Sequence, residues 1–240
     1  MQSNQFRCVI IDEASQTKEI DCLHPLIYGI TKVALIGDHR QLPPTIISKV
    51  CEPALNQSPF ERFFEHFKGK RLDLLSLRMQ YRMRKEICAF PSQQFYSGRL
   101  ESAHPKIGVN LAIPLASSLV FDIDHGRECT KDCSKFNEKE ANFVIRLLKM
   151  INRKLNPQSP ITIGIISFYD AQRKLIQSKI SEIKSTLSTN FDIQVENVDA
   201  FQGKEKDIVI LSCVRAPTNA NLTNNYTGTL GFITSPQRIN

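Results

Sequence analysis

The segment CVIIDEAS (residues 8–15) places an apolar run of β-strand character directly before two adjacent carboxylates, Asp12 and Glu13. A second segment, ALIGDHRQLPP (residues 34–44), follows the same plan and ends in a polar loop with Gln41 and two stiffening prolines. Adjacent carboxylates beside a Gln that positions water are the groups that a nucleoside triphosphatase uses. These two segments therefore give the first indication of both fold and chemistry.

The chain around these segments alternates between strand and helix patterns. Residues 6–12 and 33–38 predict two buried strands, and residues 19–29 predict a short helix between them. Together they form one βαβ unit with parallel strands and a right-handed crossover. Because ligands bind at the carboxyl edge of such a sheet, we expect Glu13 and Gln41 to lie beside each other.

The rest of the chain continues the alternation. Ser58 and Glu61 have capping-box spacing, with Pro59 in the first helical position, which predicts a helix through Phe67. Further predicted strands are 71–77, 119–123, 161–167, 193–198 and 207–214, and further predicted helices are 85–96, a long helix capped at Asn137, and 171–187. The expected fold class is α/β with parallel sheets in two blocks, the second beginning near Gln80.

Composition and charge restrict the class of protein. The chain has 240 residues, 41% apolar and 23% charged, and contains no apolar run long enough for a membrane span, so we expect no membrane partner. The net charge is +7, and residues 76–240 carry all of the excess, with 22 basic against 15 acidic side chains. This excess fits a nucleic-acid partner and a merely basic surface equally well.

The polar groups of the first block have distinct predicted tasks. Asp12 can hold Mg²⁺ through water, because this hard cation prefers carboxylate oxygens and keeps its own waters. Glu13 can accept a proton from an attacking water, and Gln41 can hydrogen-bond both that water and a phosphate oxygen. Taken alone, an apolar strand that ends in Asp-Glu also fits a solvated strand end.

Two polar segments of the second block add candidate residues. The sequence QYRM offers Arg82 to neutralise charge on a transferring phosphoryl group, and Tyr81 as a flat face for a base. In the loop VDAFQGKEKD (residues 198–207), Gly203 permits close backbone approach to a ligand and Glu205 can accept from a ribose hydroxyl. Without context, the Tyr-Arg pair also fits ordinary surface and core.

The chain resembles the superfamily 1B helicases, in the branch of senataxin and the nonsense-mediated-decay helicase, through DEAS, GDHRQLPP, QYRM, VDAFQGKEKDIVILSCVR and GFITSPQRIN in this order. The resemblance extends over nearly the whole chain. It implies two RecA-like parallel-sheet domains, the core of a P-loop NTPase helicase, of which the first is incomplete. Residues 1–79 would be the C-terminal part of the first domain. Residues 80–240 would be most of the second, truncated at its C-terminal end, with a hinge near residues 77–82.

The resemblance also implies roles by position. Asp12 would hold Mg²⁺, Glu13 would be the catalytic carboxylate, and Gln41 would sense the γ-phosphate. Arg82 would be an arginine finger, and Tyr81 would stack on adenine. The remaining implied contacts are Gln202, Gly203 and Glu205 with the nucleotide, and Ser167, Tyr169 and Asn197 with the nucleic acid.

An activity follows from the same resemblance. Helicases of this kind use ATP and Mg²⁺ to move 5′→3′ on single-stranded nucleic acid, by opening and closing the cleft between their two domains. The implied partners are single-stranded RNA or DNA and RNA–DNA hybrids, bound with little sequence preference. The implied setting is RNA processing or transcription termination, and the resemblance to senataxin implies a nuclear location.

Two departures from the family pattern bear on this activity. None of the ten glycines lies in a GxxxxGK[ST] pattern, the loop that cradles phosphates in these enzymes. The chain also ends before a segment in which the family has a further arginine. We therefore expect a piece of a longer polypeptide that does not hydrolyse ATP unaided. The missing loop leaves open another class, a non-catalytic module that binds single strands or a protein.

A metal site is the other alternative that the sequence raises. His125, Cys129 and Cys133 follow one another at four-residue intervals. A fourth ligand is not evident and the usual short CxxC spacing is missing, so we expect a solvated loop rather than a zinc site.

Overall fold

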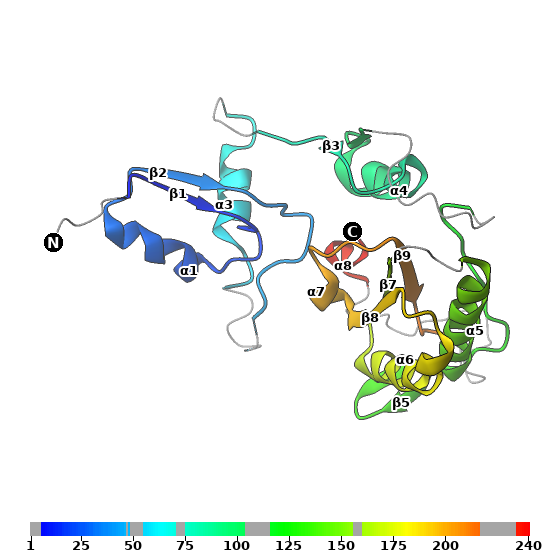
Figure 1. The fold of residues 1–240 in the computed structure, drawn as a ribbon. Helices are drawn as coiled ribbons and strands as arrows, with labels where there is room; N and C mark the ends of the chain where they lie inside the picture. Colours follow the sequence, from blue (N-terminus) through cyan, green and yellow to red (C-terminus); the bar gives the residue numbers. More distant parts are fainter. Residues whose placement is uncertain are drawn as a thin grey trace, which may run out of the picture. The chain divides into compact units, whose positions relative to one another are not determined.

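The computed structural model describes residues 6–46, 48, 55–70, 75–103, 116–155, 160–216 and 234–240. The chain divides into two compact units (Figure 1). Unit 1 comprises Met1–Leu77 with Thr234–Asn240, and unit 2 comprises Arg78–Ile233.

Unit 1 is built on the predicted βαβ arrangement. Strands β1 (Cys8–Ile11) and β2 (Lys32–Leu35) pair in parallel, in register from Cys8 opposite Lys32 to Ile11 opposite Leu35. Between them lie α1 (Glu19–Leu23) and a 3-10 helix, η1 (His24–Tyr28). The 3-10 helix ends at Gly29, whose φ of 71° is a left-handed conformation that favours glycine. The strand, helix and strand predicted for this region are confirmed.

The predicted burial of these two strands is wrong. Ile10 is 66% exposed and Val33 is 49% exposed, although both lie in the apolar runs that suggested a buried sheet. Within the described residues the sheet has only these two strands. A two-stranded sheet has too little surface packed against it to bury both faces, so the apolar side chains stay in contact with solvent.

The capping signal at Ser58 is confirmed. Helix α3 (Pro59–Phe67) begins at Pro59, and Ser58 Oγ accepts a hydrogen bond from the Glu61 backbone N–H at 3.1 Å. The cap satisfies one of the N–H groups that a helix leaves without an intrahelical partner. A short helix, α8 (Pro236–Ile239), also belongs to unit 1, where Asn240 Nδ2 donates to the Arg40 carbonyl at 3.1 Å.

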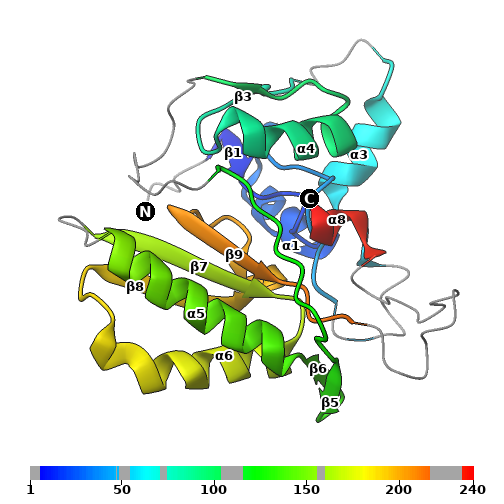
Figure 2. The same cartoon turned by 90° about the vertical axis from the view of Figure 1, so that its right-hand side faces the viewer.

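Unit 2 contains a three-stranded parallel sheet in the order β8-β7-β9, with β7 (Ile161–Ser167), β8 (Phe191–Asn197) and β9 (Ile208–Ser212). Helices α5 (Glu138–Leu155) and α6 (Asp170–Ile183) lie side by side over one face of this sheet (Figure 2). A 3-10 helix, η2 (Lys184–Thr186), continues α6. The parallel α/β fold predicted for this block is confirmed.

The core of unit 2 lies between that sheet face and the two helices. Alternate residues of β7 face the helices, as the two-residue period of a strand requires. The buried core residues are Ala141, Val144, Ile145, Leu148, Ile161, Ile163, Ile165, Ile176 and Val195. Asn137 Oδ1 accepts from the Glu140 N–H at 3.2 Å and so caps α5, as the sequence predicts.

The described residues of unit 2 also form smaller elements. A parallel pair, β3 (Met79–Gln80) and β4 (Glu101–Ser102), flanks helix α4 (Lys85–Tyr96), and a short helix, α7 (Val198–Phe201), follows β8. An antiparallel hairpin of β5 (Cys129–Lys131) and β6 (Ser134–Phe136) lies where the sequence predicts a solvated loop around Cys129 and Cys133.

One predicted strand is wrong, and a second is described only at its last three residues, which form no strand. Residues 119–123 form no strand, and Val120 is 95% exposed. In the predicted strand 71–77, residues 71–74 lie outside the described residues, and Leu75 and Leu77 are 93% and 89% exposed. An apolar run becomes a strand only when another backbone pairs with it, and that pairing is not encoded in the run itself.

A membrane crossing requires a long apolar helix. The helices in the described parts of the chain include none with the necessary length and apolar character.

Candidate functional site

The carboxylates of unit 1 lie immediately after β1. Glu13 has a φ of 51°, a left-handed conformation that non-glycine residues seldom adopt, and its backbone N–H donates to Asp12 Oδ1 at 2.9 Å. Its carboxylate accepts from Gln16 Nε2 at 3.0 Å and stays exposed. Asp12 is also exposed. The two acids are thus exposed at the strand end, and each uses one carboxylate oxygen to accept a hydrogen bond within the loop.

The loop after β2 packs directly against this loop. The Ala14 N–H donates to the Ile36 carbonyl at 2.8 Å, and the Asp38 N–H donates to Ser15 Oγ at 3.2 Å. A Cβ on Gly37 would lie 2.8 Å from the Ser15 backbone nitrogen. Only glycine therefore lets the two loops approach this closely, and the approach places both loops at one edge of the sheet.

Gln41 is oriented by Asp38. Gln41 Nε2 donates to Asp38 Oδ2 at 2.9 Å, and Asp38 Oδ1 accepts from the Arg40 N–H at 3.0 Å. Sequence reasoning assigned no role to Asp38. The pattern D-x-x-Q could have suggested one, because a carboxylate readily accepts hydrogen bonds from the backbone N–H groups of its own loop. Asp38 fixes the direction of the Gln41 amide.

His39, in the same loop, packs against helix α3. Its ring stacks on Phe64 of α3, with centroids 4.1 Å apart. Burial lowers the pKa of His39, and the adjacent Asp38 carboxylate only partly opposes that effect. The imidazole is therefore neutral at pH 7 and packs as an aromatic ring against the helix.

In unit 2, two predicted site residues from distant segments come together. Arg82 Nε donates to Glu205 Oε2 at 2.9 Å, which joins the turn after β3 to the loop after α7. Both side chains are more than half exposed, so this pair adds little to stability and can exchange for another partner. Tyr81, next to Arg82, is 69% exposed.

The segment that leads into the Glu205 loop is held by a helix cap and by a buried aromatic ring. Asn197 Oδ1 accepts from the Ala200 N–H at 2.8 Å and caps α7. Phe201 is buried, and a Cβ on Gly164 of β7 would lie 2.3 Å from its ring, so β7 needs a glycine at that position. The chain then passes Gln202 and turns at Gly203, whose φ is 76°. Gln202, Gly203 and Glu205 thus follow directly after Phe201, whose ring is held in place by packing.

Ser167 and Tyr169, which the resemblance places on the nucleic-acid path, are buried in this structure. Ser167 is 0% exposed and its hydroxyl donates to the Ser212 carbonyl at 3.2 Å. Tyr169 is 7% exposed, and its hydroxyl accepts from Arg215 Nη1 at 3.4 Å. Both side chains therefore hold the carboxyl end of the sheet together, and their contact with nucleic acid stays a prediction.

Arg215 belongs to a partly buried ion-pair cluster that the sequence does not reveal. Glu128 accepts from Arg215 Nε at 2.6 Å and from Lys135 Nζ at 2.6 Å, with the Glu128 side chain 9% exposed. Burial alone would raise the pKa of Glu128, but the hydrogen bonds from Lys135 and Arg215 outweigh burial and lower it. The carboxylate therefore stays ionised and ties the β5–β6 hairpin to the chain after β9.

A second buried polar cluster lies at the same end of the sheet. Gln172 Nε2 donates to Ser212 Oγ at 2.9 Å, and Ser212 Oγ donates to Glu140 Oε2 at 2.6 Å. The Asn137 N–H donates to Gln172 Oε1 at 2.8 Å. These bonds join α5, α6 and β9 and leave the strand ends rigid.

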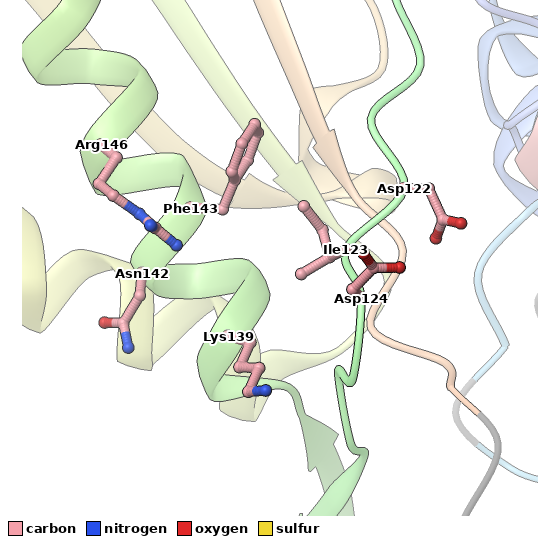
Figure 3. Close-up of a pocket in the computed structure, with 7 residues that line it drawn as sticks. All are labelled: Asp122, Ile123, Asp124, Lys139, Asn142, Phe143 and Arg146. Atoms are coloured by element: carbon pink, nitrogen blue, oxygen red, sulfur yellow. The ribbon is translucent and has the colours of Figure 1, made fainter.

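A pocket of about 370 Å³ lies between α5 and the segment before β5 (Figure 3). Lys139 and Arg146 line one side and Asp122 and Asp124 the other, while Phe143 stacks obliquely on Phe121. None of the predicted site residues lines this pocket. The pocket has equal numbers of cationic and carboxylate side chains, so its charge favours neither an anionic nor a cationic ligand.

The sequence raised a zinc site at His125, Cys129 and Cys133 as an alternative. Within the described ranges, His, Cys, Asp and Glu side chains form no group of three placed to hold a metal ion. Cys129 and Cys133 are exposed on the β5–β6 hairpin, and Cys133 occupies its tight turn with a φ of 62°.

Comparison with known proteins places the chain in a family. The chain matches the family described as AAA domain over residues 55–240, and a second family with the same description over residues 1–49. It is 39% identical over 245 residues to "Probable helicase senataxin" of Homo sapiens, covering 98% of this chain and 9% of that protein. It is 36% identical over 249 residues to "Regulator of nonsense transcripts 1" of Dictyostelium discoideum, covering 99% and 18%.

A third relative, "Helicase sen1" of Schizosaccharomyces pombe, is 33% identical over 253 residues, which is 99% of this chain and 14% of that protein. The chain thus spans less than a fifth of the length of these three relatives. The matched regions include all the motifs quoted from the sequence. The chain therefore belongs to the superfamily 1B helicases, in the branch of senataxin and the nonsense-mediated-decay helicase, and has their RecA-like α/β fold.

Proposed function

We propose that this chain forms part of an ATP-dependent helicase that couples ATP hydrolysis to 5′→3′ movement on single-stranded nucleic acid. The observation that carries the proposal is the hydrogen-bonded pair of loops after β1 and β2, which holds Glu13 and Gln41 at one sheet edge. We assign residues 1–79 to the first RecA-like domain and residues 80–240 to the second, although Thr234–Asn240 group with unit 1.

In unit 1, Asp12 and Glu13 supply two exposed carboxylates, which suit Mg²⁺ because this ion takes one or two carboxylates and completes its shell with water and phosphate. Mg²⁺ would neutralise charge that develops on the phosphate oxygens. Glu13 would accept the proton of the attacking water, and Gln41, directed by Asp38, would position that water.

In unit 2, Arg82 would neutralise the same developing charge, and Tyr81 would stack on the base. Gln202, Gly203 and Glu205 would contact the nucleotide, and Glu205 would exchange its bond to Arg82 for one to a ribose hydroxyl. A weak exposed ion pair suits this exchange, because little stability is lost when it breaks.

We further propose that the strand is RNA or DNA, RNA–DNA hybrids included, and that Ser167, Tyr169 and Asn197 lie along its path. Since Ser167 and Tyr169 are buried, they would act by holding the backbone of the strand ends rather than through their side-chain tips. A nuclear location and a role in RNA processing or transcription termination are parts of the same proposal.

The test is strand-stimulated ATPase activity of the complete natural polypeptide that contains this sequence. Glu13→Gln should lower kcat by at least about a hundredfold, because general-base catalysis contributes roughly 10²–10⁴. Glu65→Gln, an exposed carboxylate on α3, is the matched control and should leave kcat unchanged. An unchanged rate in Glu13→Gln would contradict the proposal. Strand binding without any ATPase would favour the non-catalytic binding module instead.

A further inference from the structure

The side chain of Gln80, at the end of β3, makes four hydrogen bonds. Oε1 accepts from the backbone N–H groups of Arg82 at 3.0 Å and Met83 at 2.7 Å. Nε2 donates to the Met83 carbonyl at 2.7 Å and to Ser102 Oγ at 2.6 Å. A primary amide has two donor hydrogens and two acceptor lone pairs, so Gln80 uses its full bonding capacity here.

These bonds build the turn that presents Tyr81 and Arg82. Both N–H groups that follow Tyr81 are held by one side chain, and the same side chain reaches Ser102 on the paired strand β4. Gln80 is half-buried, whereas the side chains of Tyr81 and Arg82 are largely exposed. The backbone of the turn is therefore fixed while the two side chains that it carries remain accessible.

We propose that Gln80 is a positioning residue for ATP hydrolysis, which sets the place of the Arg82 guanidinium and the Tyr81 ring without touching the nucleotide. This inference rests on the proposed function, because it assumes that Arg82 and Tyr81 act on ATP. Charge stabilisation and stacking both depend on placement, and an error of about 1 Å can cost roughly a hundredfold in rate.

Two substitutions distinguish the contribution of the Gln80 side-chain oxygen from that of its NH₂ group. Gln80→Ala removes all four bonds. Gln80→Glu keeps the oxygen that accepts from the backbone but turns a second oxygen toward the Met83 carbonyl, where the amide now donates. Both variants should lower kcat by about a hundredfold and raise the KM for ATP. Gln94→Ala, on an exposed position of α4, is the matched control and should behave as the wild type.

A double-mutant cycle distinguishes positioning from general support of the fold. In an Arg82→Ala background, Gln80→Ala should lower kcat by less than about threefold, because the group through which it acts is already gone. Fully additive losses would overturn the inference. Unfolding midpoints of every variant are measured in parallel. Should Gln80→Ala fail to fold, Gln80→Glu and Ser102→Ala carry the same cycle.

Failure of this inference is distinguishable from failure of the proposed function. A complete polypeptide without strand-stimulated ATPase, or one in which Glu13→Gln keeps the rate, overturns both. ATPase activity that depends on Glu13 but is unchanged by Gln80→Glu overturns only the role of Gln80.

Discussion

The side-chain amide of Gln41 donates a hydrogen bond to the Asp38 carboxylate, with Nε2 and Oδ2 2.9 Å apart. Asp38 in turn accepts from the Arg40 N–H and donates its own N–H to Ser15 of the neighbouring loop. Asp38 therefore connects the loop of the two carboxylates to the residue proposed to position water. This connection is the reason to expect that the two loops act as one unit.

Asp38→Asn tests this connection. The substitution keeps an oxygen for the Arg40 N–H but can present an NH₂ group to the Gln41 amide, which removes the acceptor that directs Gln41. We expect kcat for ATP to fall by roughly tenfold to a hundredfold with little change in the free energy of unfolding. Asp21→Asn, on an exposed position of α1, is the control, and equal rates in the two variants would contradict the role of Asp38.

Gly164→Ala tests the packing that supports the loop of Gln202, Gly203 and Glu205. The new methyl group would lie 2.3 Å from the Phe201 ring and 3.1 Å from Lys206 Cγ. Overpacking of this kind costs about 1–3 kcal/mol in the free energy of unfolding, and the shift of Phe201 should raise the KM for ATP through Gln202 and Gly203. Adding Phe201→Leu to the variant should recover part of the stability. A fully stable, fully active Gly164→Ala variant would show that the loop does not depend on this contact.

Glu128 should make the stability of unit 2 sensitive to acid. Its folded pKa is lowered by Lys135 and Arg215, whereas the unfolded value is about 4.3. Its contribution is therefore fully present above the unfolded pKa and is lost as the pH falls through the folded pKa. At pH 7, Glu128→Gln should cost about 1–3 kcal/mol, because it leaves two partly buried cations without their carboxylate.

Urea unfolding from pH 7 downwards measures this effect. The stability difference between wild type and Glu128→Gln should shrink as the pH falls below about 4.3. Glu182→Gln, on an exposed position of α6, should track the wild type throughout. A difference that stays constant with pH would mean that the carboxylate charge of Glu128 does not stabilise the fold.

Local signals predicted the elements of this fold well. Ser58 and Asn137 mark the starts of α3 and α5, because a side-chain oxygen must satisfy a free N–H at a helix start. The apolar run 161–167 is the central strand β7, and its alternate isoleucines form the core. Both signals depend only on neighbouring residues, so one sequence suffices to read them.

Contacts between distant residues were not predictable in this way. Glu128 and Arg215 are far apart in the chain, and no periodic pattern relates them. The same holds for Gln172 and Ser212 in the second polar cluster. The run 119–123 has the composition of a strand but no pairing backbone, and instead Phe121 packs on Phe143.

The candidate site shows the same difference between what local sequence signals reveal and what only the structure reveals. The sequence suggested Glu13, Gln41, Arg82 and Glu205 as candidates from their residue types and motifs, and the structure adds hydrogen-bond partners for Gln41 and for the turn of Arg82. Asp38 holds Gln41, and Gln80 holds the turn of Arg82. Such partners are missed from sequence because a Gln or Asp in a loop fits many uses, and only coordinates show which bonds it makes.

The central claim is that Glu13 and Arg82 act on the same ATP molecule. A double-mutant cycle on single-turnover ATP hydrolysis, in the complete natural polypeptide with a saturating single strand, tests it most directly. We expect Arg82→Ala to lower the rate by roughly 10³-fold with a much smaller loss of ATP affinity, and Glu13→Gln with Arg82→Ala to be only slightly slower than Glu13→Gln alone. Rate losses that multiply fully, or equal losses of rate and affinity in Arg82→Ala, would contradict the account.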